Sequence, residues 1–278
     1  MELYKKTGYL NDSFKIFHLI DEHMSDVEFH YHDFLKLMIL IQGNVTYCIE
    51  GKYYKLKPYD IVLVNAGEIH KPFIESGETY ERIILYISPE LLNQHQTSTY
   101  DLAYCFKKAK QDQTSILRLE SIKKSKLYQI CEELERSYET KEYANELYNE
   151  ILFLEFMIHL NRAAIHNHVT YPEDNYSNPK VLKIIHYIND HLKEDLSIDG
   201  IARTFYLNKH YLMHLFKSET GYTLGNYIAN KRLLLAREMI QNGSSITNAC
   251  YECGYKNYSS FSRAYKKQFK SIPKNLLE

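Results

Sequence analysis

Long apolar runs are missing from this 278-residue sequence. No stretch approaches the ~18 consecutive apolar residues that a membrane-spanning helix needs. The first residues, MELYKKTGYLND, also lack the apolar core of a secretory signal. We therefore expect a cytoplasmic protein with no membrane partner. The length is enough for about two domains of ~100–200 residues each.

Cysteine is scarce and irregularly spaced, which argues against a framework of disulfides. The five cysteines are Cys48, Cys105, Cys131, Cys250 and Cys253. The last two form a CxxC pair, but no second pair lies near it in the sequence. The pair therefore predicts two small buried side chains rather than a metal or redox centre.

Acidic and basic residues are unevenly distributed, although the net charge is only −1. From Asn178 onward the sequence has 15 Lys and Arg against 8 Asp and Glu, a net charge of +7, and the part before it carries −8. A basic module joined to an acidic one indicates that only the second half meets a polyanion.

The first 87 residues contain short runs rich in β-branched and aromatic residues, separated by turn signals. The expected strands are Phe14–Ile20, Phe34–Ile41, Val45–Glu50, Tyr53–Leu56, Ile61–Val64 and Ile83–Ile87. Many short strands at close spacing favour a small barrel or jelly roll, whose interior can hold a small ligand.

From about Ser115 the period becomes helical, with amphipathic segments at Ile116–Tyr138 and Tyr143–His166. In the second segment, spacings of four and three place a seam on one helix face. The seam residues are Leu147, Ile151, Leu154, Ile158, Asn161 and Ile165. Such a seam either packs on the barrel or pairs with its copy in a second chain, where a single Asn can fix the register. We favour a homodimer through this helix.

Residues 167–179 are polar, contain two prolines and show no periodicity, so they predict a linker. From Lys180 the pattern is helical to the end, and residues suited to cap helix N-termini precede several segments. These caps are Ser197, Asn208, Thr223, Ser245 and Asn257. With a last turn opened by Pro273, we expect seven helices.

A unit of helix, tight turn and second helix occurs twice in this half. The first copy reads IARTFYLNKHYLMHLFKSETG from Ile201, and the second reads ACYECGYKNYSSFSRAYKKQFK from Ala249. The first helices are offset by 48 residues and the second helices by 49, so the second turn is one residue longer. The repeat predicts two helix-turn-helix units whose second helices, about 208–220 and 257–269, enter DNA major grooves.

The open faces of these two helices carry the candidates for reading bases. They are Lys209, His210, Met213 and His214 in the first helix, and Tyr258, Ser259, Ser262 and Arg263 in the second. Arg263 is the strongest candidate because its guanidinium can contact guanine O6 and N7 together. Other cations are expected to bind phosphates, which adds affinity without sequence information. These are Lys217, Lys231, Arg232, Lys266, Lys267 and Lys270.

Several motif elements recur through the last 100 residues. They stand here as Ser197-Ile-Asp-Gly-Ile-Ala202, Leu215-Phe216-Lys217, Gly221, Tyr227-Ile228, Arg232-Leu233, Ala236, Ile246, Gly254-Tyr255, Phe261-Ser-Arg263-Ala-Tyr265-Lys266-Lys267 and Pro273. With them, the segment from Ile184 to Leu276 resembles the DNA-binding domain of the AraC/XylS family of transcription regulators. The sequence departs from the family pattern at Cys250, Lys270 and His214, where Ala, Gly and Arg are usual.

This resemblance implies an N-terminal barrel that senses a small molecule. It also implies two recognition helices that enter successive major grooves of double-stranded DNA, about one turn or ~34 Å apart. The resemblance also implies activation of transcription by contact with RNA polymerase, which is usual in this family, although no residue of this sequence distinguishes an activator from a repressor.

In the barrel segment, His30 and His32 precede a hairpin and the stretch LKPYDIVLVNAGEIHKPF, which contains His70. This pattern resembles the sensor barrel of the cupin superfamily, whose metal-binding members bring two such histidines, a carboxylate and a later histidine together. Lys36 stands where the carboxylate is expected, and its charge opposes a divalent metal. Three interpretations are open: a metal site, merely structural histidines, and an organic effector bound by His30, His32, Lys36 and His70. We favour the effector and predict neither a metal nor a cofactor.

Together these patterns predict an α+β protein in four parts. We expect a cupin-like effector-sensing barrel at 1–110, a helical dimerisation or linking segment at 111–166, a linker at 167–179 and a DNA-binding domain at 180–278. The expected function is an effector-responsive transcription regulator and not an enzyme. One alternative, a cupin-type metalloenzyme fused to a DNA-binding domain, requires a metal in the barrel. Another, an effector-independent DNA-binding protein, predicts no ligand-dependent change in stability.

Overall fold

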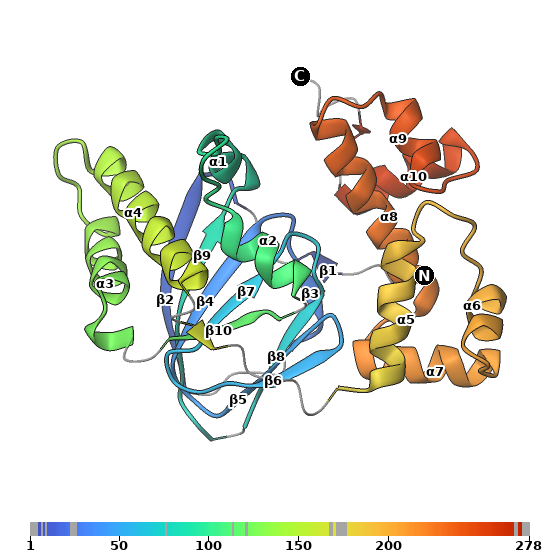
Figure 1. Cartoon of the computed structure of the whole chain (residues 1–278), viewed down its shortest axis with the longest axis horizontal. Coiled ribbons are helices and arrows are strands. Elements are labelled where there is room, and N and C mark those ends of the chain that lie inside the picture. The colour runs from blue at the N-terminus through green and yellow to red at the C-terminus, as the bar shows by residue number, and fades with distance from the viewer. Residues whose placement is uncertain are drawn as a thin grey trace. The chain divides into compact units, whose positions relative to one another are not determined.

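The computed structural model describes residues 5–6, 8, 10–22, 27–75, 77–112, 114–119, 122–166, 169–170, 177–269 and 272–273. They form two compact units, one between residues 6 and 176 and the other from Ser177 onward (Figure 1). The first unit is rich in strands and the second is helical. The predicted α+β class is therefore confirmed.

Two sheets make up the first unit, and the strand pairs recorded in both are antiparallel. One sheet has the order β1 (Lys5–Lys6), β3 (His30–Tyr31), β8 (His70–Ile74), β5 (Val45–Ile49) and β6 (Lys52–Lys55). The other has the order β11 (Val169–Thr170), β10 (Ile116–Leu119), β7 (Ile61–Val64), β4 (Leu35–Gln42), β9 (Tyr80–Ile87) and β2 (Phe14–Asp21). All six predicted strands are present.

Alternation along the second sheet separates two hydrophobic clusters. In β4, Leu37 and Ile39 belong to the cluster shared with the helices, whereas Met38 and Leu40 belong to a cluster that also contains residues of β5 and β6. The second cluster therefore lies between the two sheets, because residues of both contribute to it. Lys36 shares the strand phase of Met38, so its side chain also enters the space between the sheets.

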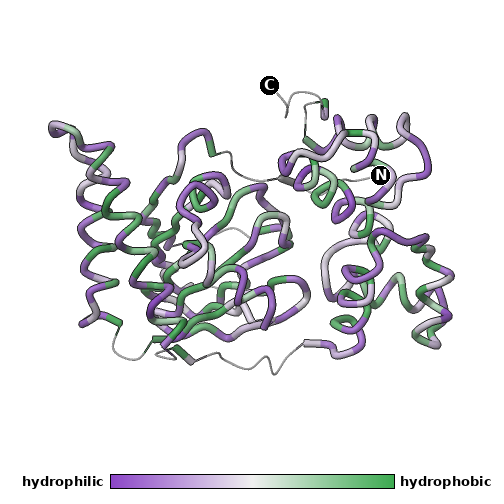
Figure 2. Tube along the Cα trace, turned by 45° about the horizontal axis from the view of Figure 1, so that its top comes forward, coloured by the Kyte–Doolittle hydropathy of each residue, from purple (hydrophilic) through white to green (hydrophobic). Residues whose placement is uncertain are grey.

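Helices cover the other face of the second sheet (Figure 1). They are α1 (Pro89–Gln94), α2 (Tyr104–Gln111), the short 3₁₀ helix η1 (Ile122–Lys124), α3 (Lys126–Tyr138) and α4 (Asn145–Ile165). Along α3 and α4, hydrophobic and hydrophilic residues alternate (Figure 2). The hydrophobic residues of α3 and α4 join the sheet in one cluster. The predicted segment 111–166 thus packs in the same compact unit as the barrel strands.

The helix predicted at Ile116–Tyr138 is wrong over its first residues. Ile116–Leu119 forms β10, which pairs with β7 through Ile116 and Leu117. The α-helix begins only after Ser125, whose side chain accepts a hydrogen bond from the backbone of Tyr128. Pairing with a sheet edge outweighs the local helical pattern, because each strand residue then satisfies backbone groups that the sheet leaves open.

The predicted linker 167–179 is also only partly correct. Val169–Thr170 forms β11, which pairs with β10, and Pro179 is the first residue of a helix capped by Asn178. Residues 167–168 and 171–176 of the predicted linker lie outside the described residues.

Six helices occupy residues 177–269. They are α5 (Pro179–Asp190), α6 (Ile198–Thr204), α7 (Lys209–Thr220), α8 (Leu224–Gln241), α9 (Ile246–Glu252) and α10 (Tyr258–Phe269). Each predicted cap accepts a backbone hydrogen bond at its helix N-terminus, as the sequence indicated. The caps are Ser197, Asn208, Thr223, Ser245 and Asn257. A seventh helix at Pro273 falls mostly outside the described residues.

The core of the second helical repeat joins α8 to α9 and α10. Its members are Leu233, Ala236, Ile240, Ala249, Cys250, Cys253, Phe261 and Tyr265. Both cysteines of the CxxC pair are buried and outside any disulfide, as are the other three cysteines. The prediction that this pair serves as small core residues is confirmed.

Candidate ligand site and DNA-binding surface

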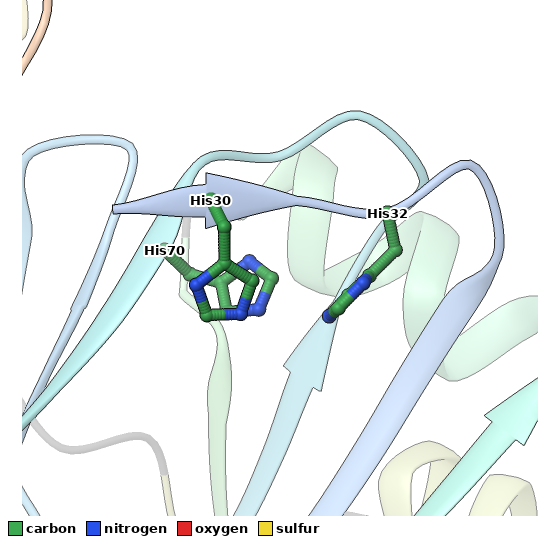
Figure 3. Close-up of side chains that lie close together, drawn as sticks. All are labelled: His30, His32 and His70. Atoms are coloured by element: carbon green, nitrogen blue, oxygen red, sulfur yellow. The ribbon is translucent and has the colours of Figure 1, made fainter. Parts of the chain in front are cut away.

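Three histidines converge between the sheets of the first unit (Figure 3). His30 of β3 and His70 of β8 are paired residues of neighbouring strands, and His32 follows β3 directly. Their nearest imidazole nitrogens all lie within 4.8 Å of one another, and all three side chains are buried.

Backbone contacts set the proton positions of two of these rings. Nδ1 of His30 lies 2.8 Å from the carbonyl of Glu28, and Nδ1 of His70 lies 3.0 Å from the carbonyl of Glu68. A carbonyl only accepts, so each Nδ1 carries a proton, and in the neutral ring of His70 the other nitrogen, Nε2, presents a lone pair. In the described part of the chain, Nε2 of His70 is buried without a hydrogen-bond partner. Burial, followed by the charges of Lys36 and the other two histidines, holds the pKa of His70 well below its usual value.

Lys36 adds a buried cation to this cluster. Its side chain is only 6% exposed, and its Nζ donates to the hydroxyl of Tyr47 at 3.0 Å. Among the described residues it forms no ion pair with a carboxylate, whereas Arg82 of β9 pairs with Asp21. Burial and then the charge of Arg82 lower the pKa of Lys36 from 10.5 to about 7.

The structure therefore brings together all four predicted effector residues, His30, His32, Lys36 and His70. The three imidazoles resemble a nitrogen ligand set for a divalent metal, but Lys36 supplies a positive charge where such a site gains from a carboxylate. An ammonium donor beside an imidazole acceptor instead suits a ligand that carries both an anionic group and a hydroxyl.

The face of α7 is open where the sequence predicted base contacts. His210 and His214 are exposed, Lys209 and Met213 are half-buried, and Lys217 is exposed. The core-facing positions predicted with them, Leu212 and Phe216, are fully buried. Nζ of Lys209 lies 2.9 Å from a carboxylate oxygen of Asp199, so this lysine is ion-paired in the free protein.

The corresponding face of α10 is also open. Tyr258, Ser259, Arg263, Lys266 and Lys267 are exposed, and Ser262 is half-buried. Nε of Arg263 donates to the carbonyl of Ser259 at 3.2 Å, one helical turn earlier. This weak exposed bond holds the arginine along the helix and leaves the other guanidinium donors available.

Arg232 differs from the predicted phosphate contact. Its guanidinium donates to the backbone carbonyls of Leu192, Glu194 and Gly254. We correct its assignment, because the guanidinium is already bonded to three backbone carbonyls in the free protein. Lys231 lies with its Nζ 5.4 Å from the centre of the Tyr227 ring, and Lys270 lies outside the described residues.

Two exposed tyrosines were missed by the sequence reasoning. Tyr211 on α7 is 50% exposed, and Tyr206 in the turn before α7 is 96% exposed. Tyr206 has a φ of 54°, a conformation that side chains other than glycine rarely adopt. Two signals could have found them: a large aromatic residue in the turn, at Tyr206, and an aromatic residue out of phase with the buried Leu212, at Tyr211.

The predicted seam of α4 is divided between two faces. Ile151, Ile158 and Ile165 are 52%, 38% and 53% exposed, and Leu147 is also exposed. Asn161 instead is buried, where it accepts from the backbone of Cys105 and donates to the carbonyl of Leu102. Leu154 is half-buried against the core. Asn161 is therefore wrongly placed on the outer seam, because its polar groups bind the backbone of Cys105 in α2 and of Leu102, two residues before this helix begins.

Among the helices described, none is both long enough and apolar enough to cross a bilayer.

Comparison with known proteins matches both units to sequence patterns. Residues 16–157 match an AraC-like ligand-binding domain, and residues 201–278 match a helix-turn-helix domain. The transcriptional activator RhaS of Escherichia coli (strain SMS-3-5 / SECEC) is 22% identical over 263 residues, covering 91% of this chain and 88% of RhaS. RhaS of Shigella sonnei shows the same identity over 259 residues, with coverages of 91% and 88%.

Solved structures are also similar. An apo form of ToxT from Vibrio cholerae aligns with a TM-score of 0.41 and 16% identity, over 96% of this chain and 97% of ToxT. The C-terminal domain of the response regulator AraT from Geobacillus stearothermophilus aligns with a TM-score of 0.35 and 25% identity, over 36% of this chain and 84% of that domain.

The ligand-binding pattern alone covers half of the sequence, and the helix-turn-helix pattern covers the repeat with the open faces of α7 and α10. The chain therefore belongs to the AraC family, and it is an effector-responsive, DNA-binding transcription regulator rather than an enzyme.

Proposed function

We propose that α7 and α10 read two successive major grooves of one DNA site. The observation that carries this proposal is the repeat itself: two capped helices at equivalent positions each bury one face and present polar side chains on the other. The predicted base contacts are Lys209, His210, Met213, His214, Tyr258, Ser259, Ser262 and Arg263. The predicted phosphate contacts are now Lys217, Lys231, Lys266, Lys267 and Lys270, without Arg232.

Arg263 provides the test of base reading. A binding site is first selected from random DNA with the full-length protein. Arg263→Ala should then weaken binding to this site by ~1–3 kcal/mol and relax base preference under α10. Lys267→Ala is the matched control, since loss of a phosphate contact weakens selected and random DNA alike and lowers the salt slope by about 1. Equal losses on both DNAs for Arg263→Ala would make this residue a phosphate contact.

We propose that the effector binds at His30, His32, Lys36 and His70. The supporting observation is a buried ammonium that has no carboxylate partner among the residues the structure describes, beside an imidazole nitrogen that finds no donor among them. A thermal-shift screen of the full-length protein against small hydroxylated anions tests this. A ligand at 100 times its dissociation constant should add about 2.7 kcal/mol of stability. A stabilising ligand that acts equally on Lys36→Met would place the effector elsewhere.

We further propose a homodimer through the exposed face of α4. Ile151, Ile158 and Ile165 recur every seven residues, which gives one apolar stripe suited to pairing with a second copy. Ile158→Asp should yield monomers by light scattering without loss of helix content. The same substitution at Ile20, an exposed isoleucine of β2, should leave the dimer intact. An unchanged dimer in Ile158→Asp would exclude this face.

The activity we infer is activation of transcription in the cytoplasm through contact with RNA polymerase. Support comes from the relatives, which are named transcriptional activators. Transcription in vitro from a promoter that carries the selected site tests this, because an activator raises transcript yield with purified polymerase and a repressor lowers it.

A further inference from the structure

Arg232 lies on α8, the helix that connects the two helix-turn-helix units, and its side chain bonds to segments on both sides. Nε donates to the carbonyl of Leu192 at 2.9 Å and Nη2 to that of Glu194 at 2.5 Å. Both carbonyls belong to the loop between α5 and α6, which leads into the first helix-turn-helix. Nη1 donates to the carbonyl of Gly254 at 3.0 Å, in the turn between α9 and α10 of the second helix-turn-helix.

The turn at Gly254 approaches this guanidinium so closely that no side chain fits there. A Cβ added to Gly254 would lie 2.7 Å from Cζ and Nη2 of Arg232 and 2.8 Å from the carbonyl oxygen of Leu192. The φ of Gly254 is +84°, which also favours glycine. The turn between α9 and α10 is therefore packed directly on Arg232 and on the backbone of the α5–α6 loop.

An ion pair lies beside this contact. Nζ of Lys256 in the second turn is 2.9 Å from a carboxylate oxygen of Asp195 in the α5–α6 loop. Both side chains are largely exposed, so this pair alone contributes little to stability. It nevertheless joins the same two segments as Arg232 does, the α5–α6 loop and the α9–α10 turn, so the two contacts lie along one interface between the helix-turn-helix units.

We propose that Arg232 is a positioning residue that fixes α7 relative to α10 and thereby sets the spacing of the two DNA subsites. The proposal rests on the proposed binding of both helices to one site. The planar fork of a guanidinium can bond three carbonyls at fixed angles, which an ammonium cannot do. Because α6–α7 follows one bonded segment and α10 follows the other, loss of the fork frees each recognition helix to shift.

The experiment uses the full-length protein and its selected DNA site, with one base pair inserted or deleted between the two subsites. One base pair displaces the second subsite by about 3.4 Å and rotates it by about 35°. For the wild type we expect affinity to fall at least about tenfold on both altered sites, because several contacts are lost together. Arg232→Lys and Gly254→Ala should bind the selected site less tightly and show a flatter dependence on spacing.

Lys231→Ala, at the preceding position of α8, is the matched control. It should weaken all three DNAs by the same factor and lower the salt slope. Far-UV circular dichroism at the binding temperature verifies that each variant is folded. A purely structural role for Arg232 would lower the unfolding midpoint but leave a spacing profile parallel to that of the wild type, and that result would overturn the proposal.

The wild type alone gives a second test that needs no variant. Footprinting first establishes whether the protein covers two adjacent major grooves. If it does, and affinity is insensitive to spacing, the positioning role of Arg232 is refuted while two-groove binding stands. If the footprint covers only one groove, the proposed function itself fails, whatever the role of Arg232.

Discussion

Replacing Lys36 by Met should stabilise the first unit, and the gain should depend on pH. Lys36 is buried and has no carboxylate partner among the described residues, so folding transfers its charge out of water. Burial and the charge of Arg82 lower its pKa from 10.5 to about 7. At about 1.4 kcal/mol for each tenfold change in proton affinity, this difference corresponds to a free energy on the order of 5 kcal/mol.

The sign follows from the number of protons bound in each state. Below pH 7 Lys36 is protonated in both the folded and the unfolded chain, so the full cost of burying the charge is present. Between pH 7 and pH 10.5 the unfolded chain binds more protons than the folded chain, so the stability of the wild type rises with pH. A methionine carries no charge at any pH. The advantage of Lys36→Met should therefore be largest near pH 6 and shrink toward pH 10.

Urea unfolding between pH 6 and pH 10, followed by circular dichroism, measures this difference. Lys110→Met is the control, because Lys110 is an exposed lysine of α2 and its replacement should have nearly the same small effect at every pH. A pH-independent difference between Lys36→Met and the wild type would refute the reasoning, as would a large loss of stability at pH 6. The same variant should lose stabilisation by the effector, since the ammonium is then absent.

Three further variants probe other buried or paired groups. Asn161→Ala removes the donor and the acceptor that bond two buried backbone groups and should lower the free energy of unfolding in urea by ~2–4 kcal/mol. A loss of stability no larger than that of a substitution at an exposed residue would contradict the burial of Asn161. Arg118→Leu leaves the fully buried carboxylate of Asp60 without its cation and should lower the free energy of unfolding by ~3–5 kcal/mol. The loss should exceed that of Asp60→Ala, which leaves only a partly exposed guanidinium, and equal losses would refute this ordering. Burial lowers the pKa of His18, but carboxylates on α3 and β9 outweigh it and raise the pKa overall, so the stabilisation is present below pH 6.5 and lost as pH rises through the raised pKa. His18→Gln should remove this part of the pH dependence of the melting temperature, and an unchanged profile would exclude the histidine as its source.

The helical half of the chain was predictable because its signals are local. A cap such as Asn208 bonds backbone groups two and three residues away, and Gly221 ends α7 with a φ of 76°. Both features can be read within one helix. The repeat of the unit then located the second recognition helix without any knowledge of tertiary contacts.

The strand-rich half was less predictable because its elements depend on partners far away in the sequence. Ile116–Leu119 is a strand only because β7 offers an open edge, more than fifty residues earlier. Strand β8 was missed because Pro72 interrupts its pattern, and β3 because two residues show no period. Asn161 looked like a seam residue until its bonds to the backbone near residue 103 placed it inward.

Among the described residues, Arg232 of the helical unit and Lys36 of the strand-rich unit differ in how far their polar groups are satisfied. In the helical unit the guanidinium of Arg232 is bonded to three backbone carbonyls, which holds the side chain in one arrangement. In the first unit Lys36 bonds only a hydroxyl, and Nε2 of His70 bonds nothing that the structure describes. A satisfied polar network specifies one arrangement, whereas an incompletely satisfied one keeps a free-energy cost that a complementary ligand can relieve. Under the two proposals above, an effector that supplies the missing partners would therefore gain binding energy in the strand-rich unit, whereas Arg232 would hold the geometry for DNA in the helical one.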